Sequence, residues 1–145
     1  MKHVNRLPLA LLLLRLGVFV VMLLWTLDKF MRPEHTAKVF ESFYYIKGIG
    51  NSAAYAIGAV ELLILAGFLA GFRKKFTYGA VLLLHAISTV SSFKQYLTPF
   101  AGMNLMFYAA WPMLAACIAL YLLRDLDTLC VIHAPEALSS ERSAT

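Results

Sequence analysis

Three side chains that can carry a charge or a proton stand inside long apolar stretches of this sequence. Arg15 follows a run of leucines, Glu61 lies in AIGAVELLILAG, and His85 lies in VLLLHAIS. Ionisable residues at membrane depth are costly and usually face a protein interior or water, so they are candidates for function by default. A guanidinium and a carboxyl would each offset the other's cost of burial, which leaves the imidazole free to exchange protons.

A stripe of polar residues continues along the chain from His85. The residues that follow it on one helical face, at spacings of three, one, three and three, are Ser88, Thr89, Ser92 and Gln95. Such a stripe predicts a surface that faces water or other polar helices. The alternative is structural, because serine and threonine in membrane helices commonly bond their own backbone or a neighbouring helix.

The composition is typical of a membrane protein that crosses the bilayer several times. The chain of 145 residues is 61% hydrophobic and 14% charged, whereas soluble domains are about a quarter charged. In this class Lys and Arg report topology, so the net charge of +5 does not indicate a nucleic-acid partner. The two cysteines form no C-x-x-C motif and the four histidines are scattered, which gives no support for a metal site or a haem held by two histidines.

Four segments are long and apolar enough to span a bilayer, for which about 20 residues are needed. They run over about 8–30, 51–72, 76–93 and 103–123. Pro112 is expected to kink or loosen the last of them. We therefore predict an all-α fold, an integral membrane four-helix bundle in one domain, residues 1–130, followed by a polar C-terminal tail, 131–145.

The first loop, RPEHTAKVFESFYYIKGIG, is more than a linker. Its apolar and charged residues alternate with a roughly helical period, which predicts a short amphipathic segment at the membrane interface. An aromatic-rich loop anchored at headgroup depth is the alternative.

The distribution of Lys and Arg predicts the orientation. With the N-terminus inside, more of these residues lie on the inner side than on the outer side, and the turn Arg73-Lys74-Lys75 contributes most. The positive-inside rule then places both termini in the cytoplasm. The expected location is a cytoplasmic (inner) membrane of bacterial type.

Depth estimates bring the three ionisable groups into one layer. At about 1.5 Å rise per residue, Arg15 lies about 10 Å, Glu61 about 16 Å and His85 about 14 Å from the inner surface. We therefore predict an ion pair between Arg15 and Glu61, with His85 as candidate proton exchanger, at the floor of a polar cleft open to the outer face. A pair that only fixes helix packing is the alternative.

The predicted cleft draws residues from all four segments and contains no metal site. Its predicted lining residues are Arg15, Asp28, Lys29, Glu61, His85, Ser88, Ser92, Gln95, Asn104, Tyr108 and Trp111.

Short motifs in these helices carry a family resemblance. The first helix reads RLGVFVVMLLWTLDKFMRP, the second reads AYAIGAVELLILAGFLAGFRKK, the third carries His85 in its middle, and Leu-Arg-Asp-Leu-Asp follows the fourth. Over about residues 10–127 the chain resembles the DoxX-like family of small four-helix integral membrane proteins. The family often has a glycine shortly before the Lys at the helix end, whereas Trp25-Thr26-Leu27-Asp28 precedes Lys29 here. The resemblance implies a fold and a neighbourhood of redox, sulfur or thiol chemistry, often beside partner proteins, but no reaction.

The leading functional hypothesis is a DoxX-like membrane subunit or accessory factor for redox chemistry, with a quinone or a small sulfur compound bound in the cleft. No haem, flavin or iron–sulfur motif is visible, so at most a subunit of a membrane oxidoreductase is expected. A non-enzymatic scaffold or lipid-binding module is the alternative. A small proton-coupled transporter is the second alternative.

Several kinds of partner follow from these hypotheses. Membrane lipids and a partner oxidoreductase are expected. The motif Gly67-Phe-Leu-Ala-Gly71 is a GxxxG, which permits close helix contact either inside the bundle or with a second copy of the chain.

Overall fold

The computed structural model describes residues 6–132, and in this range the chain is all-helical, with no strand. The predicted all-α class is therefore confirmed. The elements are α1 (Leu7–Met31), α2 (Pro33–Tyr44), α3 (Asn51–Leu69), α4 (Lys74–Ser91), α5 (Phe93–Leu97), the 3₁₀ helix η1 (Asn104–Ala109) and α6 (Ala110–Leu122). Most of the predicted tail, 131–145, lies outside the described residues.

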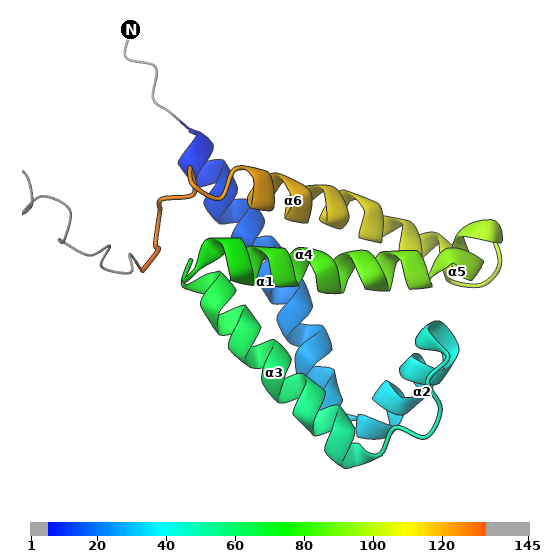
Figure 1. Ribbon diagram of the computed structural model, residues 1–145. Helices are drawn as coiled ribbons and strands as arrows, with labels where there is room; N and C mark the ends of the chain where they lie inside the picture. Colours follow the sequence, from blue (N-terminus) through cyan, green and yellow to red (C-terminus); the bar gives the residue numbers. More distant parts are fainter. Residues whose placement is uncertain (1–5, 133–145) are drawn as a thin grey trace, which may run out of the picture.

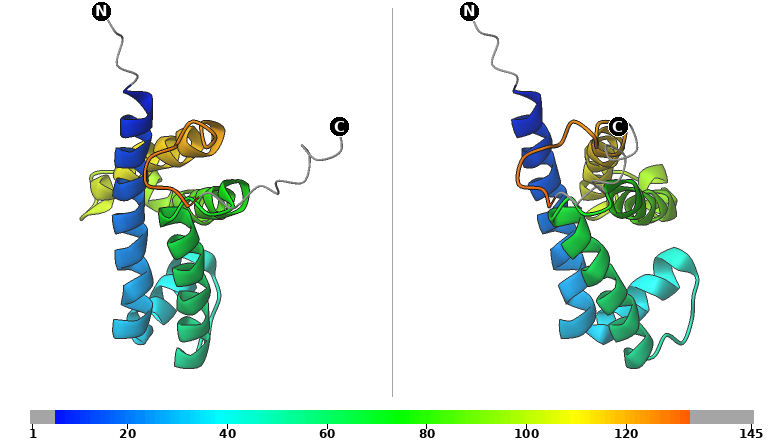
Figure 2. Two further views of the ribbon diagram at one scale, coloured as in Figure 1. Left: turned by 90° about the vertical axis from the view of Figure 1, so that its left-hand side faces the viewer. Right: turned by 60° about the vertical axis from the view of Figure 1, so that its left-hand side comes forward.

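Two antiparallel helix pairs form most of the fold. α1 packs along α3, and α4 packs along α6 (Figure 1). The pairs meet where α1 begins, α3 ends, α4 begins and α6 ends, and they diverge from there, with α2 in the opening between them (Figures 1 and 2). We call the shared end the inner end and the opposite end the outer end, after the predicted topology.

Three helical stretches in the described range are long and apolar enough to cross a membrane by length and composition. They are Leu7–Met31, Asn51–Leu69 and Asn104–Leu122, the last formed by η1 and α6 together. These stretches indicate a membrane protein. α4 is not among them, because it begins with two lysines and carries the polar stripe in its second half.

α2 takes the place of the predicted amphipathic segment. Pro33 is its first residue, where the fixed φ of proline suits a helix start and its missing N–H has no intrahelical role. The polar side chains Glu34, Lys38 and Glu41 are exposed, whereas Thr36, on another face, is buried.

Pro112 changes the fourth segment in the predicted sense. In a regular α-helix the N–H of residue 112 would bond the carbonyl of Tyr108. Proline has no N–H, so this bond is absent, and the N–H of Ala110 donates to the carbonyls of Phe107 and Tyr108. The segment begins as a 3₁₀ helix and becomes an α-helix at Ala110, two residues before Pro112.

The core lies at the inner end, where the two pairs touch. Buried apolar side chains from four helices meet there: Leu11, Val18, Leu65, Phe68, Tyr78, Val81, Cys117 and Leu120. Elsewhere on α1, Leu13 and Leu24 are more than half exposed, at 61% and 63%. Exposed apolar surface of this kind is what a helix in a membrane presents to lipid.

Candidate functional site

Arg15 and Asp127 are charged residues with no exposed surface, 0% for both side chains. Arg15 Nη1 lies 3.4 Å from Asp127 Oδ2 and donates a 3.2 Å hydrogen bond to the Tyr78 hydroxyl. That hydroxyl donates a 2.6 Å hydrogen bond to the same carboxylate oxygen. Arg15 Nη2 donates to the carbonyls of Leu129 and Cys130, at 2.5 and 3.3 Å. We call Arg15, Tyr78 and Asp127 the inner cluster; it joins α1, α4 and the chain after α6.

The chain after α6 folds back over the inner end to reach Arg15. The N–H of Ile132 donates a 2.7 Å hydrogen bond to the carbonyl of Ala70, at the end of α3. Gly71 permits this approach, because a Cβ there would lie 2.5 Å from Val131 Cγ1 and 3.0 Å from Arg15 Nη1. Its φ of +62° is also one that glycine adopts readily and other residues do not.

The predicted ion pair between Arg15 and Glu61 is wrong. α1 and α3 run antiparallel in a register that sets Gly71 against Arg15 and Thr26 against Glu61. Arg15 therefore lies level with the end of α3, whereas Glu61 lies ten residues earlier, about 15 Å away along the helix. The depth estimate assumed that all apolar segments end at one common level on the inner side. In the structure α1 begins further toward the inner side than the level at which α3 ends, so the two depths are not comparable.

Glu61 forms its ion pair with Lys29, whose Nζ lies 2.9 Å from Glu61 Oε2. The Thr26 hydroxyl lies 3.0 Å from the same oxygen. The two charged side chains are only 13% and 14% exposed. We call Thr26, Lys29 and Glu61 the outer cluster. Gly58 lets the helices approach at this level, since a Cβ there would lie 2.7 Å from the Phe30 ring.

Asp28, another predicted cleft residue, ties α1 to α2. Its carboxylate accepts a 2.6 Å hydrogen bond from Arg32 Nε and lies 2.5 Å from His35 Nδ1. Asp28 and Arg32 also form an ion pair across one helical turn. These contacts fix the direction in which the chain leaves α1.

His85 links α4 to the start of α6. Its Nε2 lies 3.0 Å from the carbonyl oxygen of Ala110, and since a carbonyl only accepts, this nitrogen carries the proton. The Thr89 hydroxyl donates to the carbonyl of His85 at 2.8 Å, and the Ser92 hydroxyl donates to that of Ser88 at 3.1 Å. Thr89 and Ser92 thus bond the backbone of the preceding turn, as expected if the polar stripe has a structural role.

Three of the remaining predicted residues, on η1 and α6, contact α5 and the turn that follows it, near the outer end. Asn104 Nδ2 donates a 2.9 Å hydrogen bond to the carbonyl of Thr98. The Tyr108 hydroxyl donates one of 3.0 Å to the carbonyl of Tyr96, and the rings of Tyr96 and Trp111 lie 5.7 Å apart. Burial raises the pKa of the Tyr96 hydroxyl above its usual value.

The predicted cleft residues thus fall into three groups. Arg15 belongs to the inner cluster, while Asp28 and Lys29 lie near the outer end of α1 and Glu61, the partner of Lys29, lies midway along α3. The others lie on α4, α5, η1 and α6. Among residues 6–132 no hydrogen bond or ion pair joins one group to another. A common cleft stays a prediction.

Sequence reasoning missed Tyr78 and Asp127. Asp127 entered the sequence analysis only as the last residue of the motif Leu-Arg-Asp-Leu-Asp that follows the fourth segment. A signal for it was present in the sequence, because a buried arginine such as Arg15 requires a carboxylate as its partner. Asp127 is a carboxylate that follows the last spanning segment at the inner end, where Arg15 also lies. Tyr78 stands one turn into α4, level with that carboxylate.

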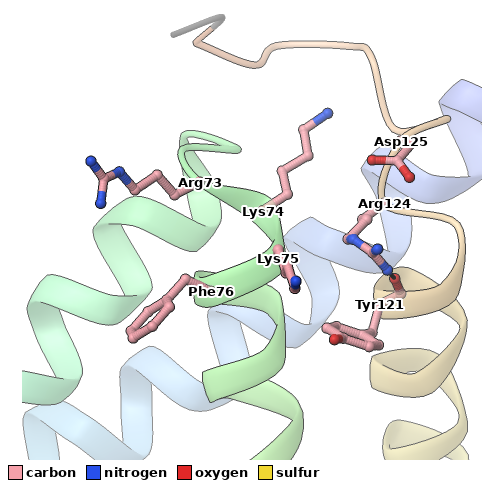
Figure 3. Close-up of a pocket in the computed structure, with 7 residues that line it drawn as sticks. All are labelled: Arg73, Lys74, Lys75, Phe76, Tyr121, Arg124 and Asp125. Carbon is pink, nitrogen blue, oxygen red and sulfur yellow. Dashed lines mark hydrogen bonds between the residues drawn. The ribbon is translucent and has the colours of Figure 1, made fainter.

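A shallow groove of about 790 Å³ opens at the inner end, between the start of α4 and the end of α6 (Figure 3). Its lining residues are Arg73, Lys74, Lys75, Phe76, Tyr121, Arg124 and Asp125. None of them belongs to the predicted cleft. Figure 3 shows the residues of α4 on one side of the groove and those of α6 and the following turn on the other.

Comparison with family models, with curated proteins and with solved structures gives no match.

Proposed function

We propose that the protein is a four-helix bundle in an inner membrane of bacterial type, with both termini cytoplasmic, and that it serves as a non-enzymatic accessory or scaffold subunit. The DoxX-like resemblance, and the partner proteins that it implies, belong to this proposal.

The observation that carries the proposal is the pairing of the buried charges. Arg15 is neutralised by Asp127 within a network that joins three segments. Lys29 is neutralised by Glu61 across α1 and α3. Ion pairs of this kind fix the relative positions of helices. A catalytic group has to meet a substrate, whereas these groups meet each other.

A redox role with a quinone or a small sulfur compound near the outer end is the second candidate. It is favoured by Gln95, whose Oε1 is buried and has no hydrogen-bond partner in the described part of the chain. An acceptor of this kind suits the hydroxyl of a reduced quinone. His85, on the preceding helix α4, would exchange the proton, and a partner protein would have to carry the electrons.

A proton-coupled transporter receives the least support. Its single working carboxyl would be Glu61, and that carboxyl already has an ammonium 2.9 Å away and a hydroxyl 3.0 Å away.

The test is purification of the full-length protein from its own membrane after mild crosslinking, with mass spectrometry of the proteins bound to it. We expect a membrane partner in fixed stoichiometry, and no quinone reduction by the protein alone. Turnover by the purified protein would make it an enzyme. A crosslinked population that contains no second protein would refute the accessory role.

The redox candidate has a separate test in thiol labelling. Ser88 is exposed on the polar stripe, and Leu83 is exposed on a different face of α4. If the stripe faces an aqueous cleft, Ser88→Cys reacts with a charged, membrane-impermeant reagent added from outside, and Leu83→Cys does not. Inertness at both positions would remove the cleft and the redox candidate with it.

A further inference from the structure

We propose that the groove between α4 and α6 at the inner end binds the phosphodiester headgroup of an anionic phospholipid. Four cationic side chains line it, Arg73, Lys74, Lys75 and Arg124, against one carboxylate, Asp125. This inference rests on the proposed function in one respect only, the side of the membrane that the groove faces. The predicted topology places the inner end, and with it the groove, at the cytoplasmic leaflet. Basic pockets between membrane helices on that side are suited to anionic headgroups.

The positive charge of the groove is not neutralised by the protein. In the described residues none of the four cations forms an ion pair. Lys74 Nζ donates to a backbone carbonyl, that of Asp127, at 2.6 Å, and Arg124 Nη1 donates to that of Tyr121, also at 2.6 Å. Lys75 has no hydrogen-bond or ion-pair partner in the described range. A bound anion would supply the missing counter-charge.

The start of α4 adds to the positive potential. Helix N-termini carry a partial positive charge and unpaired N–H groups, which favour anions. No side chain of the described chain caps this N-terminus. Lys74 and Lys75 are the first two residues of the helix, so their charges and the helix dipole act at the same place.

Two aromatic rings also line the groove, Tyr121 on the side of α6 and Phe76 at the start of α4, where its ring is directed away from α6 (Figure 3). Phe76 is 80% exposed, and the Tyr121 ring lies against α4, where a Cβ at Gly79 would be 3.3 Å from it. The Arg124 guanidinium carbon lies 4.8 Å from the centre of that ring. Both rings lie further along their helices from the inner end than the cations (Figure 3). A charged end followed by an apolar wall fits a headgroup with its acyl chain, which favours lipid over an acidic peptide.

The test uses the full-length protein in a neutral detergent, titrated with phosphatidylglycerol or with phosphatidylcholine. Native mass spectrometry counts the bound lipids, and thermal unfolding reports stabilisation. We expect phosphatidylglycerol to bind more tightly and to raise the unfolding temperature. The variants Lys75→Gln and Arg124→Gln should each weaken that binding about fivefold, since one cation near an anionic surface contributes about 1 kcal/mol. Lys47→Gln, an exposed lysine in the loop after α2, is the matched control and should leave binding unchanged.

Four outcomes would overturn the proposal. The first is equal binding of the two lipids, and the second is wild-type binding by the double variant Lys75→Gln/Arg124→Gln. The third is equal stabilisation by inorganic phosphate at the same concentration, which would make the groove a site for free anions. An acidic peptide that displaces phosphatidylglycerol from the groove at lower concentration would reassign it to a protein partner.

The side of the membrane that the groove faces is tested separately, so the proposed topology and the proposed lipid site can fail independently. Lys75→Cys should react with an impermeant thiol reagent in inside-out vesicles and not in right-side-out vesicles. The reverse pattern would refute the proposed topology while the lipid site, measured in detergent, stands. Reaction from the expected side without lipid selectivity in detergent would refute the lipid site alone.

Discussion

At the scale of single residues, the structure assigns each buried charge to a partner. A buried arginine that loses its carboxylate is left as an unpaired charge in an apolar interior, and so is the carboxylate that loses its arginine. Removal of one partner of such a pair is far more destabilising than replacement of both. The inner cluster is therefore the place where point substitutions should have their largest effect.

We expect Arg15→Gln and Asp127→Asn each to lower the free energy of unfolding in detergent by about 3–5 kcal/mol. The double variant should recover much of that loss, because no lone charge remains. Chemical or thermal unfolding of the four proteins measures the coupling. The matched control is Arg15→Gln combined with Glu61→Gln, two residues without a shared partner, whose effects should add. Coupling of Arg15 with Glu61 instead of Asp127 would contradict the inner cluster.

Gly71 should tolerate no larger residue. Gly71→Ala adds a Cβ that would lie 2.5 Å from Val131 and forces a φ of +62° on alanine, and strain of that kind costs about 1–3 kcal/mol. Gly17→Ala is the control, because α1 leaves open space around Gly17 and alanine favours a helix by about 1 kcal/mol. Thermal unfolding should show the first variant destabilised and the second unchanged or stabilised. Equal unfolding temperatures would mean that the chain after α6 does not pack on Gly71.

At the scale of elements, the lengths of the apolar helices could be predicted from the sequence. α1 covers the first predicted segment to within one residue at each end, since its apolar run is long and its limits are sharp. The last segment divides into η1 and α6 two residues before Pro112. The register between α1 and α3 could not be predicted, because it depends on Gly58 and Gly71 as contact points and on the return of the chain after α6. The error over the partner of Arg15 is an error of register.

Pro112→Ala should change stability by less than about 1 kcal/mol. Its missing N–H falls in the first turn of α6, where intrahelical partners are lacking in any case. Ala116→Pro, placed in the middle of the same helix, removes a helical hydrogen bond and should cost about 3 kcal/mol. Unfolding in detergent compares the two. A large loss in Pro112→Ala would mean that the proline is needed to hold η1 in its 3₁₀ form.

At the scale of the whole molecule, the two helix pairs are closed at the inner end and open at the outer end. The inner end holds the core, the inner cluster and the returning chain. At the outer end the ring pair of Phe43 and Phe107, 5.8 Å apart, joins α2 to η1. Stability should therefore depend on the inner end, and any change of shape on binding should occur at the outer end, where fewer contacts hold the pairs.

The number of membrane crossings decides the side on which the chain ends. Three stretches satisfy length and hydropathy, and an odd number of crossings would put the termini on opposite sides. The arrangement of the helices favours four, because Arg15, near the start of α1, contacts the carbonyl of Cys130, after the end of α6. The chain can return to that end only if α4 crosses in the opposite direction to α6, and its 18 residues span about 27 Å. A reporter fused after Thr145 should therefore read cytoplasmic, as should one fused before Met1. A periplasmic reading for the first with a cytoplasmic reading for the second would show that α4 lies at the interface and that the polar stripe faces water along its whole length.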